Sequence, residues 1–310
     1  MKVVYMGTPD FAVGALEAIL AAGHEVTAVV TQPDRQKGRG KEVQFSPVKE
    51  CAVAHGIPVL QPVRIKTPEA VEQLKQYEAD IFVVAAFGQI LSKEILEMPK
   101  YGCINIHASL LPKYRGAAPI QWAVINGEKV SGVTIMQMNE GLDTGDILFQ
   151  REVELEPKET GESLFDKLAD LGAGLVVEAL EKIASGDVSP VPQEDSLSTY
   201  AGMLTKECGR MDFSMPAVKL EQRIRGLNSW PGSYTRWRGK TLKVWDADVV
   251  NCVETKAMPG EVTEVSKDGF TVACGEGGLV LKSVQPEGKK RMAVKDFLLG
   301  YSVEIGEKLG

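Results

Sequence analysis

The sequence predicts an α/β fold in which a Rossmann-like parallel sheet is followed by a small β-barrel of the OB-like type. Short apolar strands alternate with helical stretches through residue 184, which is typical of a parallel sheet covered on both faces. Beyond a Pro- and Ser-containing stretch, short strands with Gly-rich turns replace this alternation. The 310 residues, of which 44% are hydrophobic, suffice for about two domains.

The elements of the first part follow from apolar periodicity and helix-start signals. Thr8 is suited to cap the first helix, and Pro9 suits its first turn. The helix over 160–184 has apolar residues in steps of three and four and stops near Gly186. The predicted order is strand 3–6, helix 11–22, strand 26–31, helix 46–55, strand 58–60, helix 68–76, strand 81–87, strand 102–107, helix 119–126, strand 132–138, strand 147–154 and helix 160–184.

The second part begins after residues 189–206, whose Pro and polar content is typical of a linker. The predicted domains are therefore 1–188 and 207–310. The elements expected in the second domain are helix 217–226 and strands 234–237, 241–246, 260–265, 269–273 and 278–285.

Charge and cysteine content restrict the class of protein. The net charge is −7, yet residues 208–310 carry 16 Lys and Arg against 13 Asp and Glu. This basic last third suggests a polyanionic partner, although chance scatter of surface charge explains it equally well. Five cysteines without CxxC spacing favour a reducing cytoplasm over a disulfide framework. We expect no metal, no signal peptide, no membrane span and a monomeric protein.

Asn105 and His107 are the first candidates for a functional site. They alternate with Ile104 and Ile106 on a predicted strand, so their side chains project to the same side. The carboxyl end of such a strand is where open α/β sheets bind ligands. Burying an amide and an imidazole is costly unless both are hydrogen-bonded or used. A core histidine bonded to a loop carbonyl is an equally good explanation.

Two loops could complete this site. Residues 139–146 follow strand 132–138 at its carboxyl end, and Asp143 there could orient the imidazole or hold a water. Ordinary Asp and Gly turn chemistry also explains that loop. The apolar loop after His107 could line a slot for a flat ligand, or pack under the next helix. Its residues are Ser109, Leu110, Leu111 and Pro112.

A basic loop follows the second predicted strand. Its cations, interleaved with glycines, are typical of a reader of phosphate backbones, although a solvated loop has the same composition. These cations are Arg35, Lys37, Arg39 and Lys41. The dinucleotide, P-loop and nucleophile-elbow motifs are absent from the sequence, which argues against those chemistries.

Taken together, these residues resemble the folate-dependent formyltransferases. The family signature matches in order and spacing at Asn105-Ile106-His107, at SLLP over 109–112 and at GLDTGD over 141–146. The run KYRGAAPIQ over 113–121 and the added second domain are similar to members that act on initiator tRNA. The resemblance covers essentially the whole chain and departs at Asn139, where many relatives have an acidic residue.

The resemblance implies transfer of the formyl group of 10-formyltetrahydrofolate to the α-amino group of methionyl initiator tRNA. Asn105 would donate to the formyl oxygen, His107 would donate a second hydrogen bond or relay protons, and Asp143 would hold His107 or an intervening water. Folate would lie against the SLLP loop. The apolar segment walling the pterin would be Phe87, Gly88, Gln89, Ile90 and Leu91.

The resemblance further implies that the basic loop enters the acceptor end of the tRNA. The barrel would bind the tRNA backbone, and the candidates chosen by charge are Arg236, Arg238, Lys289, Lys290 and Arg291. Two alternatives stay open. One is a formyltransferase for a small amine, such as a glycinamide ribonucleotide or an amino sugar, and the other is an RNA-binding protein without activity. A small substrate needs neither the basic loop nor a second domain.

Overall fold

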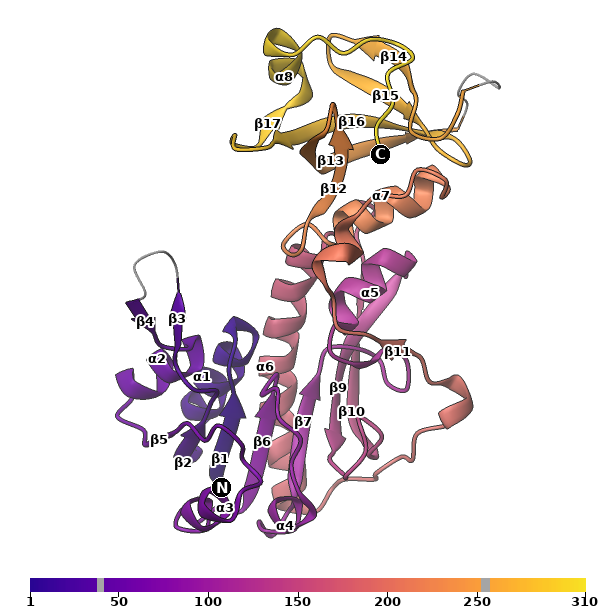
Figure 1. Cartoon of the computed structure of the whole chain (residues 1–310). Helices are drawn as coiled ribbons and strands as arrows, with labels where there is room; N and C mark the ends of the chain where they lie inside the picture. Colours follow the sequence, from indigo (N-terminus) through magenta and orange to yellow (C-terminus); the bar gives the residue numbers. More distant parts are fainter. Residues whose placement is uncertain (38–41, 252–256) are drawn as a thin grey trace. The chain divides into compact units, whose positions relative to one another are not determined.

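The computed structural model describes residues 1–37, 42–251 and 257–310, which form two compact units (Figure 1). Unit 1 consists of Met1–Pro119, Val130–Glu154 and Phe165–Ala201. Unit 2 consists of Ile120–Lys129, Leu155–Leu164 and Gly202–Gly310. Two short segments from the first part of the sequence therefore belong to unit 2.

Unit 1 is built on a seven-stranded sheet with the order β10-β9-β7-β6-β1-β2-β5. The strands are β1 (Lys2–Gly7), β2 (Glu25–Val30), β5 (Val59–Leu60), β6 (Ile81–Ala85), β7 (Cys103–His107), β9 (Val130–Gln137) and β10 (Ile147–Glu154). The pairs from β5 through β7 are parallel, which confirms the predicted core. Strand β9 runs antiparallel to both β7 and β10, so the sheet is mixed.

Helices cover both faces of this sheet, as the alternating pattern predicts (Figure 1). The helices of the first part of the chain are α1 (Val13–Ala21), α2 (Pro47–Ala54), α3 (Pro68–Leu74), α4 (Lys93–Leu96), α5 (Pro119–Asn126) and α6 (Gly161–Ser185). On one face, Cys103 of β7 and Phe82 of β6 share a buried cluster with residues of α3 and α4, among them Ile95. Side chains alternate along a strand, so Asn105 and His107 point to this same face.

The opposite face is covered by α1 and α6. Gly172 of α6 lies so close to Ile106 that an added Cβ would come within 2.9 Å of the isoleucine Cγ2. At the start of the α1 region, Phe11 packs edge-to-face on Phe165 with ring centroids 5.6 Å apart. The apolar residues of β7 thus face a closely packed helix, and the polar ones face the other side.

Two helices begin within one residue of the predicted positions, 46 and 68, and each has a side-chain cap. Ser46 caps α2 by accepting the N–H of Lys49, and Thr67 caps α3 by accepting that of Ala70. A proline occupies the first turn of each helix, where its missing N–H costs nothing.

The predicted cap at Thr8 is wrong. A 3-10 turn, Asp10–Ala12, precedes α1, and the side chain of Thr8 caps neither element. Its Oγ1 instead lies 3.3 Å from both the carbonyl oxygen of Phe87 and the backbone nitrogen of Gln32. Thr8 therefore ties the end of β1 to the ends of its two neighbouring strands, because these tertiary partners compete successfully with the local cap.

The two ends of the predicted basic loop form a pair of antiparallel strands. Strand β3 (Arg35–Lys37) pairs antiparallel with β4 (Glu42–Gln44). Arg39 and Lys41 lie outside the described residues.

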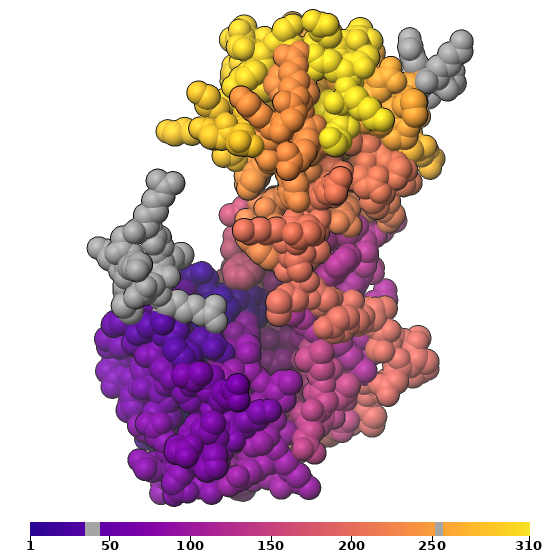
Figure 2. Space-filling model, viewed as in Figure 1, coloured from indigo at the N-terminus to yellow at the C-terminus, as the bar shows by residue number. Residues whose placement is uncertain are grey.

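The predicted linker is hydrogen-bonded to unit 1 over part of its length. Val191 and Ile147 exchange backbone hydrogen bonds of 2.8 and 2.9 Å. Further along, β11 (Tyr200–Ala201) pairs in parallel with β8 (Arg115–Gly116). Figure 2 shows the segment on the surface, in salmon at the right.

Unit 2 contains an antiparallel sheet with the order β12-β13-β16-β15-β14, with β17 paired to β16. Its elements are α7 (Ala217–Gly226), β12 (Ser233–Trp237), β13 (Lys240–Val250), β14 (Val262–Ser266), β15 (Gly269–Ala273), β16 (Gly278–Pro286), β17 (Met292–Ala293) and α8 (Val294–Gly300). Backbone hydrogen bonds join the last residues of the chain to Val262 of β14, to Gly260 just before it, and to Arg236 of β12, so they connect the two edges of the sheet. Aromatic rings pack in its core, where the ring centroids of Trp237 and Phe297 lie 5.3 Å apart.

Candidate active site

Asn105 lies on the sheet face that α3 and α4 cover only in part. Its side chain is half-buried, and it pairs in register with Val84 of β6 and Met136 of β9. Among the residues that the structure describes, none hydrogen-bonds to the Asn105 amide. A half-buried amide that lacks partners is costly in the folded protein unless a ligand or solvent satisfies it. Asn105 is therefore available as a donor and acceptor.

His107, two residues further, is only 5% exposed. Its Nε2 lies 2.9 Å from the carbonyl oxygen of Tyr114. Because a carbonyl only accepts, Nε2 carries a hydrogen in this arrangement. Its Nδ1 lies 3.7 Å from Oδ2 of Asp143, which is longer than a direct hydrogen bond. The imidazole is thus hydrogen-bonded to a loop carbonyl and also turned toward a carboxylate. The core histidine and the site histidine, which the sequence left as alternatives, are therefore compatible.

The two partners of His107 are held by strained backbone. Tyr114 has φ 62° and Asp143 has φ 52°, both in the left-handed region that non-glycine residues rarely adopt. Such conformations typically cost about 1–3 kcal/mol each and cluster at functional sites. The carboxylate is fixed further, since its Oδ2 accepts the N–H of Gly116 at 2.8 Å.

Two positions beside Asp143, Gly116 and Gly145, leave no room for a side chain. Gly116 has φ 114°, and a Cβ there would lie 2.8 Å from the carbonyl oxygen of Ala201. A Cβ on Gly145 would lie 1.7 Å from the carbonyl oxygen of Gln137. Both positions let two backbone segments approach closely beside Asp143.

The route by which Asp143 reaches His107 differs from the predicted one. The sequence places residues 139–146 and His107 at the same edge of the sheet, on the basis that both follow strand ends. Because β9 is antiparallel to β7, its last residue, Gln137, pairs with Ile104 at the start of β7. Met138 packs against the α3/α4-face cluster. The loop therefore turns back over that face to bring Asp143 beside the imidazole.

Asn139, the predicted departure from the family pattern, stabilises the turn of this loop. Its Oδ1 accepts the backbone N–H of Gly141 at 3.0 Å and the hydroxyl of Thr144 at 2.8 Å. Both bonds end on a side-chain oxygen, so an aspartate could make the same two contacts. The departure leaves the geometry around Asp143 unaffected.

The SLLP loop is pinned by Thr134 of β9. The Thr134 hydroxyl donates to the carbonyl of Ser109 and accepts the N–H of Leu111. The Ser109 and Leu111 side chains are buried, with 1% and 3% exposed, so they support the loop from within. Leu110 and Pro112 are half-buried and present apolar surface that a ligand could contact.

The segment 87–91 divides in the same way between buried and accessible residues. Phe87 and Leu91 are buried, whereas Gly88 is exposed and Ile90 has 69% of its surface exposed. Gln89 is anchored, because its Oε1 accepts the N–H of Ile65 at 2.7 Å. Gly88 and Ile90 are thus the members whose surface is open to a flat ligand.

A separate polar group lies at the base of the β3–β4 hairpin. The Lys49 ammonium contacts Asp34 Oδ2 at 2.5 Å and Gln61 Oε1 at 2.7 Å. The Gln61 amide donates in turn to Asp34 Oδ1 and to the carbonyl of Gln32. The ammonium also lies 3.8 Å from the ring centre of Phe45. We call Asp34, Lys49 and Gln61 the anchor cluster, since Asp34 and Phe45 flank the hairpin that carries Arg35 and Lys37.

The basic candidates of unit 2 are not equivalent. Arg238 pairs with Glu307 and stacks on Trp237, and Arg236 donates to the carbonyl of Gly239. Arg291 lies over the ring of Trp245 and donates to a serine hydroxyl. The side chains of Lys289 and Lys290 are exposed, and within the described ranges neither has an ion-pair partner.

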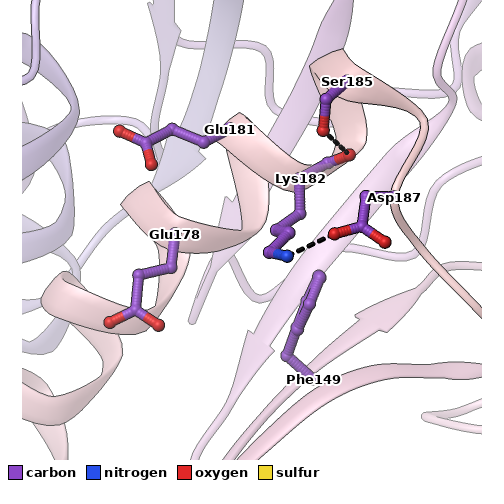
Figure 3. A pocket seen from close by; sticks show the side chains of 6 residues that line it. All are labelled: Phe149, Glu178, Glu181, Lys182, Ser185 and Asp187. Carbon is purple, nitrogen blue, oxygen red and sulfur yellow. Dashed lines mark hydrogen bonds and ion pairs between the residues drawn. The ribbon is translucent and has the colours of Figure 1, made fainter.

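A pocket of about 430 Å³ lies apart from these groups (Figure 3). It is lined by Phe149 of β10 and by residues of α6 and the segment after it, where Lys182 pairs with Asp187. Over residues 1–37, 42–251 and 257–310, no three His, Cys, Asp or Glu side chains gather as metal ligands would. No helix in these ranges combines the length and the apolar character needed to span a bilayer.

Sequence reasoning missed the residues that hold the catalytic candidates. Tyr114 and Gly116 lie in a run recognised only for its family resemblance, and Gln193 lies in the predicted linker. Nothing in their local sequence marks them, because their contacts depend on how the loops meet in the folded protein.

Comparison with known proteins identifies the family. The protein-family model for formyl transferase matches residues 1–180. The family model for the formyl transferase C-terminal domain matches residues 203–302. A methionyl-tRNA formyltransferase of Lachnospira eligens is 59% identical, and one of Agathobacter rectalis is 55% identical. The alignments cover 100% of both chains in the first case, and 99% of this chain and 98% of the relative in the second.

Among solved structures, the crystal structure of an N-formyltransferase from Helicobacter canadensis, in complex with folinic acid and dTDP-3-aminofucose, superposes with a TM-score of 0.68. It is 21% identical, and the match covers 92% of this chain and 99% of that one. At this identity the likeness concerns the fold. The two family models and the full-length relatives confirm the resemblance seen in the sequence, and the chain belongs to the formyl transferase family.

Proposed function

We propose that this protein transfers the formyl group of 10-formyltetrahydrofolate to the α-amino group of methionine esterified to initiator tRNA, for translation initiation. The observation that carries the proposal is the similarity to methionyl-tRNA formyltransferases over the full length of the chain, at 59% and 55% identity. The polar group around His107 supports it, because it offers the donors and proton acceptors that formyl transfer requires.

Asn105 serves the reaction as a hydrogen-bond donor. An α-amino group has a pKa of about 8, so much of it is neutral and nucleophilic at working pH. The larger barrier is the negative charge that develops on the formyl oxygen as the amine adds. The amide of Asn105 has no partner among the described residues and can donate to that oxygen. Removal of one such donor typically costs on the order of 100-fold in rate.

His107 and Asp143 serve as a proton relay. The attacking amine must lose a proton, and the N10 nitrogen of the departing folate must gain one. Since Nε2 of His107 faces the carbonyl of Tyr114, Nδ1 is the nitrogen that can take up and return a proton. The protonated ring would then carry its charge beside the Asp143 carboxylate, 3.7 Å away.

The proposed binding surfaces follow from exposure for folate and from charge for tRNA. Folate would contact Leu110, Pro112, Gly88 and Ile90, and their buried neighbours in the two segments would support them. Arg35, Lys37, Arg39 and Lys41 would contact the tRNA phosphates near its acceptor end. The C-terminal domain would bind the tRNA backbone, with the exposed Lys289 and Lys290 among its contacts. This division predicts that tRNA affinity falls steeply with added salt and that folate affinity does not.

Organisation and location follow from the same proposal. Residues 1–188 would form the catalytic domain, 189–206 the linker and 207–310 the tRNA-binding domain. The protein would act as a monomer in the cytoplasm, where initiator tRNA is charged.

The test is a formylation assay with the purified full-length protein. The acceptors are methionyl initiator tRNA, methionyl elongator tRNA, a glycinamide ribonucleotide and a nucleotide-linked amino sugar, each with and without 10-formyltetrahydrofolate. We expect the highest kcat/KM for the charged initiator tRNA and no product without the donor. Preference for either small amine would overturn the tRNA assignment, and absence of product with every acceptor would leave an RNA-binding protein.

A further inference from the structure

Gln193, in the exposed segment between the two predicted domains, turns its side chain inward and contacts both sides of the candidate site. Its Nε2 donates to the carbonyl oxygens of Asp143 at 2.8 Å and Gly145 at 2.7 Å. Its Oε1 accepts from Nε and Nη2 of Arg115 at 3.0 and 2.9 Å. A primary amide has two donor hydrogens and two acceptor lone pairs, so every position on Gln193 is used.

The contacts with Arg115 matter because its two neighbours in the chain hold the candidate site through their backbone groups. The residue before it, Tyr114, presents its carbonyl to His107, and the residue after it, Gly116, donates its N–H to Asp143. Gln193 therefore connects the Asp143 loop to the loop that holds His107.

Thr199 reinforces the connection from the same segment. Its hydroxyl accepts the N–H of Tyr114 at 2.8 Å, and its carbonyl accepts the N–H of Arg115 at 2.9 Å. Between residues 189 and 200 the side chains are exposed, except for Gln193 and Ser198, which are half-buried. Gln193 and Thr199 thus hold the two loops through hydrogen bonds.

We infer that Gln193 is a positioning residue for formyl transfer: it holds the backbone of Asp143 so that the carboxylate stays turned toward Nδ1 of His107. The inference rests on the proposed function of that pair. Asp143 has φ 52°, and a residue in that region relaxes unless its surroundings restrain it. Two hydrogen bonds from Gln193 to the Asp143 loop supply that restraint, and two from Arg115 hold Gln193 in place. Displacement of a reacting group by about 1 Å can cost on the order of 100-fold in rate.

The first variant is Gln193→Ala, which removes all four hydrogen bonds. We expect kcat to fall on the order of 10- to 100-fold, because the Asp143 carboxylate is no longer held in position beside the His107 imidazole. The KM values for tRNA and for the formyl donor should stay within twofold, because Gln193 lies outside both proposed binding surfaces. A merely structural role would lower the fraction of folded protein and leave the kcat of the folded part unchanged.

The second variant, Gln193→Glu, keeps the length and the acceptor toward Arg115 but replaces the donating nitrogen by an oxygen. At pH 8 that carboxylate oxygen would face two carbonyl oxygens and push the Asp143 loop away, so kcat should fall at least as far as in Gln193→Ala. Protonation at lower pH restores one donor hydrogen. The ratio of variant to wild-type kcat should therefore rise as the pH is lowered, whereas for Gln193→Ala it should stay flat.

Two controls match these changes. Gln137→Ala removes an amide that donates to a backbone carbonyl of the same sheet, that of Cys103 at 3.0 Å. Asp195→Asn removes the charge of the Arg115 ion pair from the same segment, at a side chain that is 84% exposed. Both should leave kcat within twofold. With only three histidines in the chain, ¹⁵N-histidine spectra should show the His107 ring signals shifted in Gln193→Ala and unshifted in both controls.

The outcomes separate the inference from the proposed function. A wild-type kcat and unshifted His107 signals in Gln193→Ala would overturn the positioning role, and so would a loss of activity equal to that of Gln137→Ala. If the wild-type protein formylates charged initiator tRNA and His107→Ala does not, the proposed function stands whatever Gln193 does. If the wild-type protein forms no product, the proposed function fails first, and the ring signals alone then decide whether Gln193 sets the geometry.

Discussion

Two polar groups of unit 1, the anchor cluster and the group around His107, differ in how completely their hydrogen bonds are used. In the anchor cluster, the Lys49 ammonium, both oxygens of Asp34 and both ends of the Gln61 amide all have partners. Around His107, the Asn105 amide has none among the described residues, and Nδ1 stays 3.7 Å from its carboxylate.

The difference separates a structural group from a chemical one. A polar group whose bonds are all internal stabilises the fold and offers nothing to a ligand. A group that is positioned but incompletely bonded costs stability and keeps donors and acceptors for a reacting molecule. Substitutions in the first group should therefore lower stability, and substitutions in the second should lower kcat.

The largest effect is expected for His107→Ala. Without the imidazole the relay has no proton acceptor at Nδ1, and kcat should fall about 1,000-fold or more. The affinity for tRNA should stay within severalfold, because the proposed tRNA contacts are elsewhere. Single-turnover formylation and a filter-binding titration measure the two quantities. Wild-type levels of product from this variant would refute the assigned role.

Asn105→Ala should have the next largest effect, lowering kcat on the order of 100-fold. The variant loses no hydrogen bond of the described protein, so Tm should change by less than about 2 °C. A large fall in Tm together with a small fall in kcat would show that Asn105 stabilises the fold, as the anchor cluster does, and would contradict the distinction between the two groups.

Lys49→Met should mainly lower stability, by about 2 kcal/mol at pH 7, because it leaves the Asp34 carboxylate without its cation. The Lys49 ammonium, and after it the Gln61 amide, hold the pKa of Asp34 below its usual value. A lowered folded-state pKa stabilises the protein above the unfolded pKa, near about 4, and this contribution is lost as pH falls through the folded value.

The difference in unfolding free energy between wild type and Lys49→Met should therefore be full at pH 7 and shrink below about pH 4. Urea unfolding at several pH values measures it. A difference that stays constant down to pH 3 would show that the ion pair is not its source.

The smallest effect is expected for Gln61→Leu. It removes the donors to Asp34 and to the carbonyl of Gln32 at a half-buried site, so about 1 kcal/mol of stability should be lost. The value of kcat should stay within twofold. A tenfold loss of kcat would mean that the anchor cluster takes part in the chemistry, and the contrast with the His107 group would fail.

Much of the fold could be predicted because its signals are local. The parallel strands, the starts of the helices near Ser46 and Pro68, and the shared direction of Asn105 and His107 follow from neighbours a few residues apart. The cap at Thr8 could not be predicted, because Phe87, 79 residues away, competes for its hydroxyl. Charge alone also could not distinguish Arg238, which is paired with Glu307, from the exposed Lys289.

By itself, the sequence determined the alternation of strands and helices, the face to which the amide and imidazole point, and the family. Only the tertiary structure decided how these parts meet. The direction of β9 sends the Asp143 loop back over the sheet, a left-handed residue aims its carboxylate, and Gln193 holds it from 50 residues away. Periodicity and capping depend on adjacent residues, whereas contacts at such separations depend on the packing of the whole unit, which no local pattern encodes.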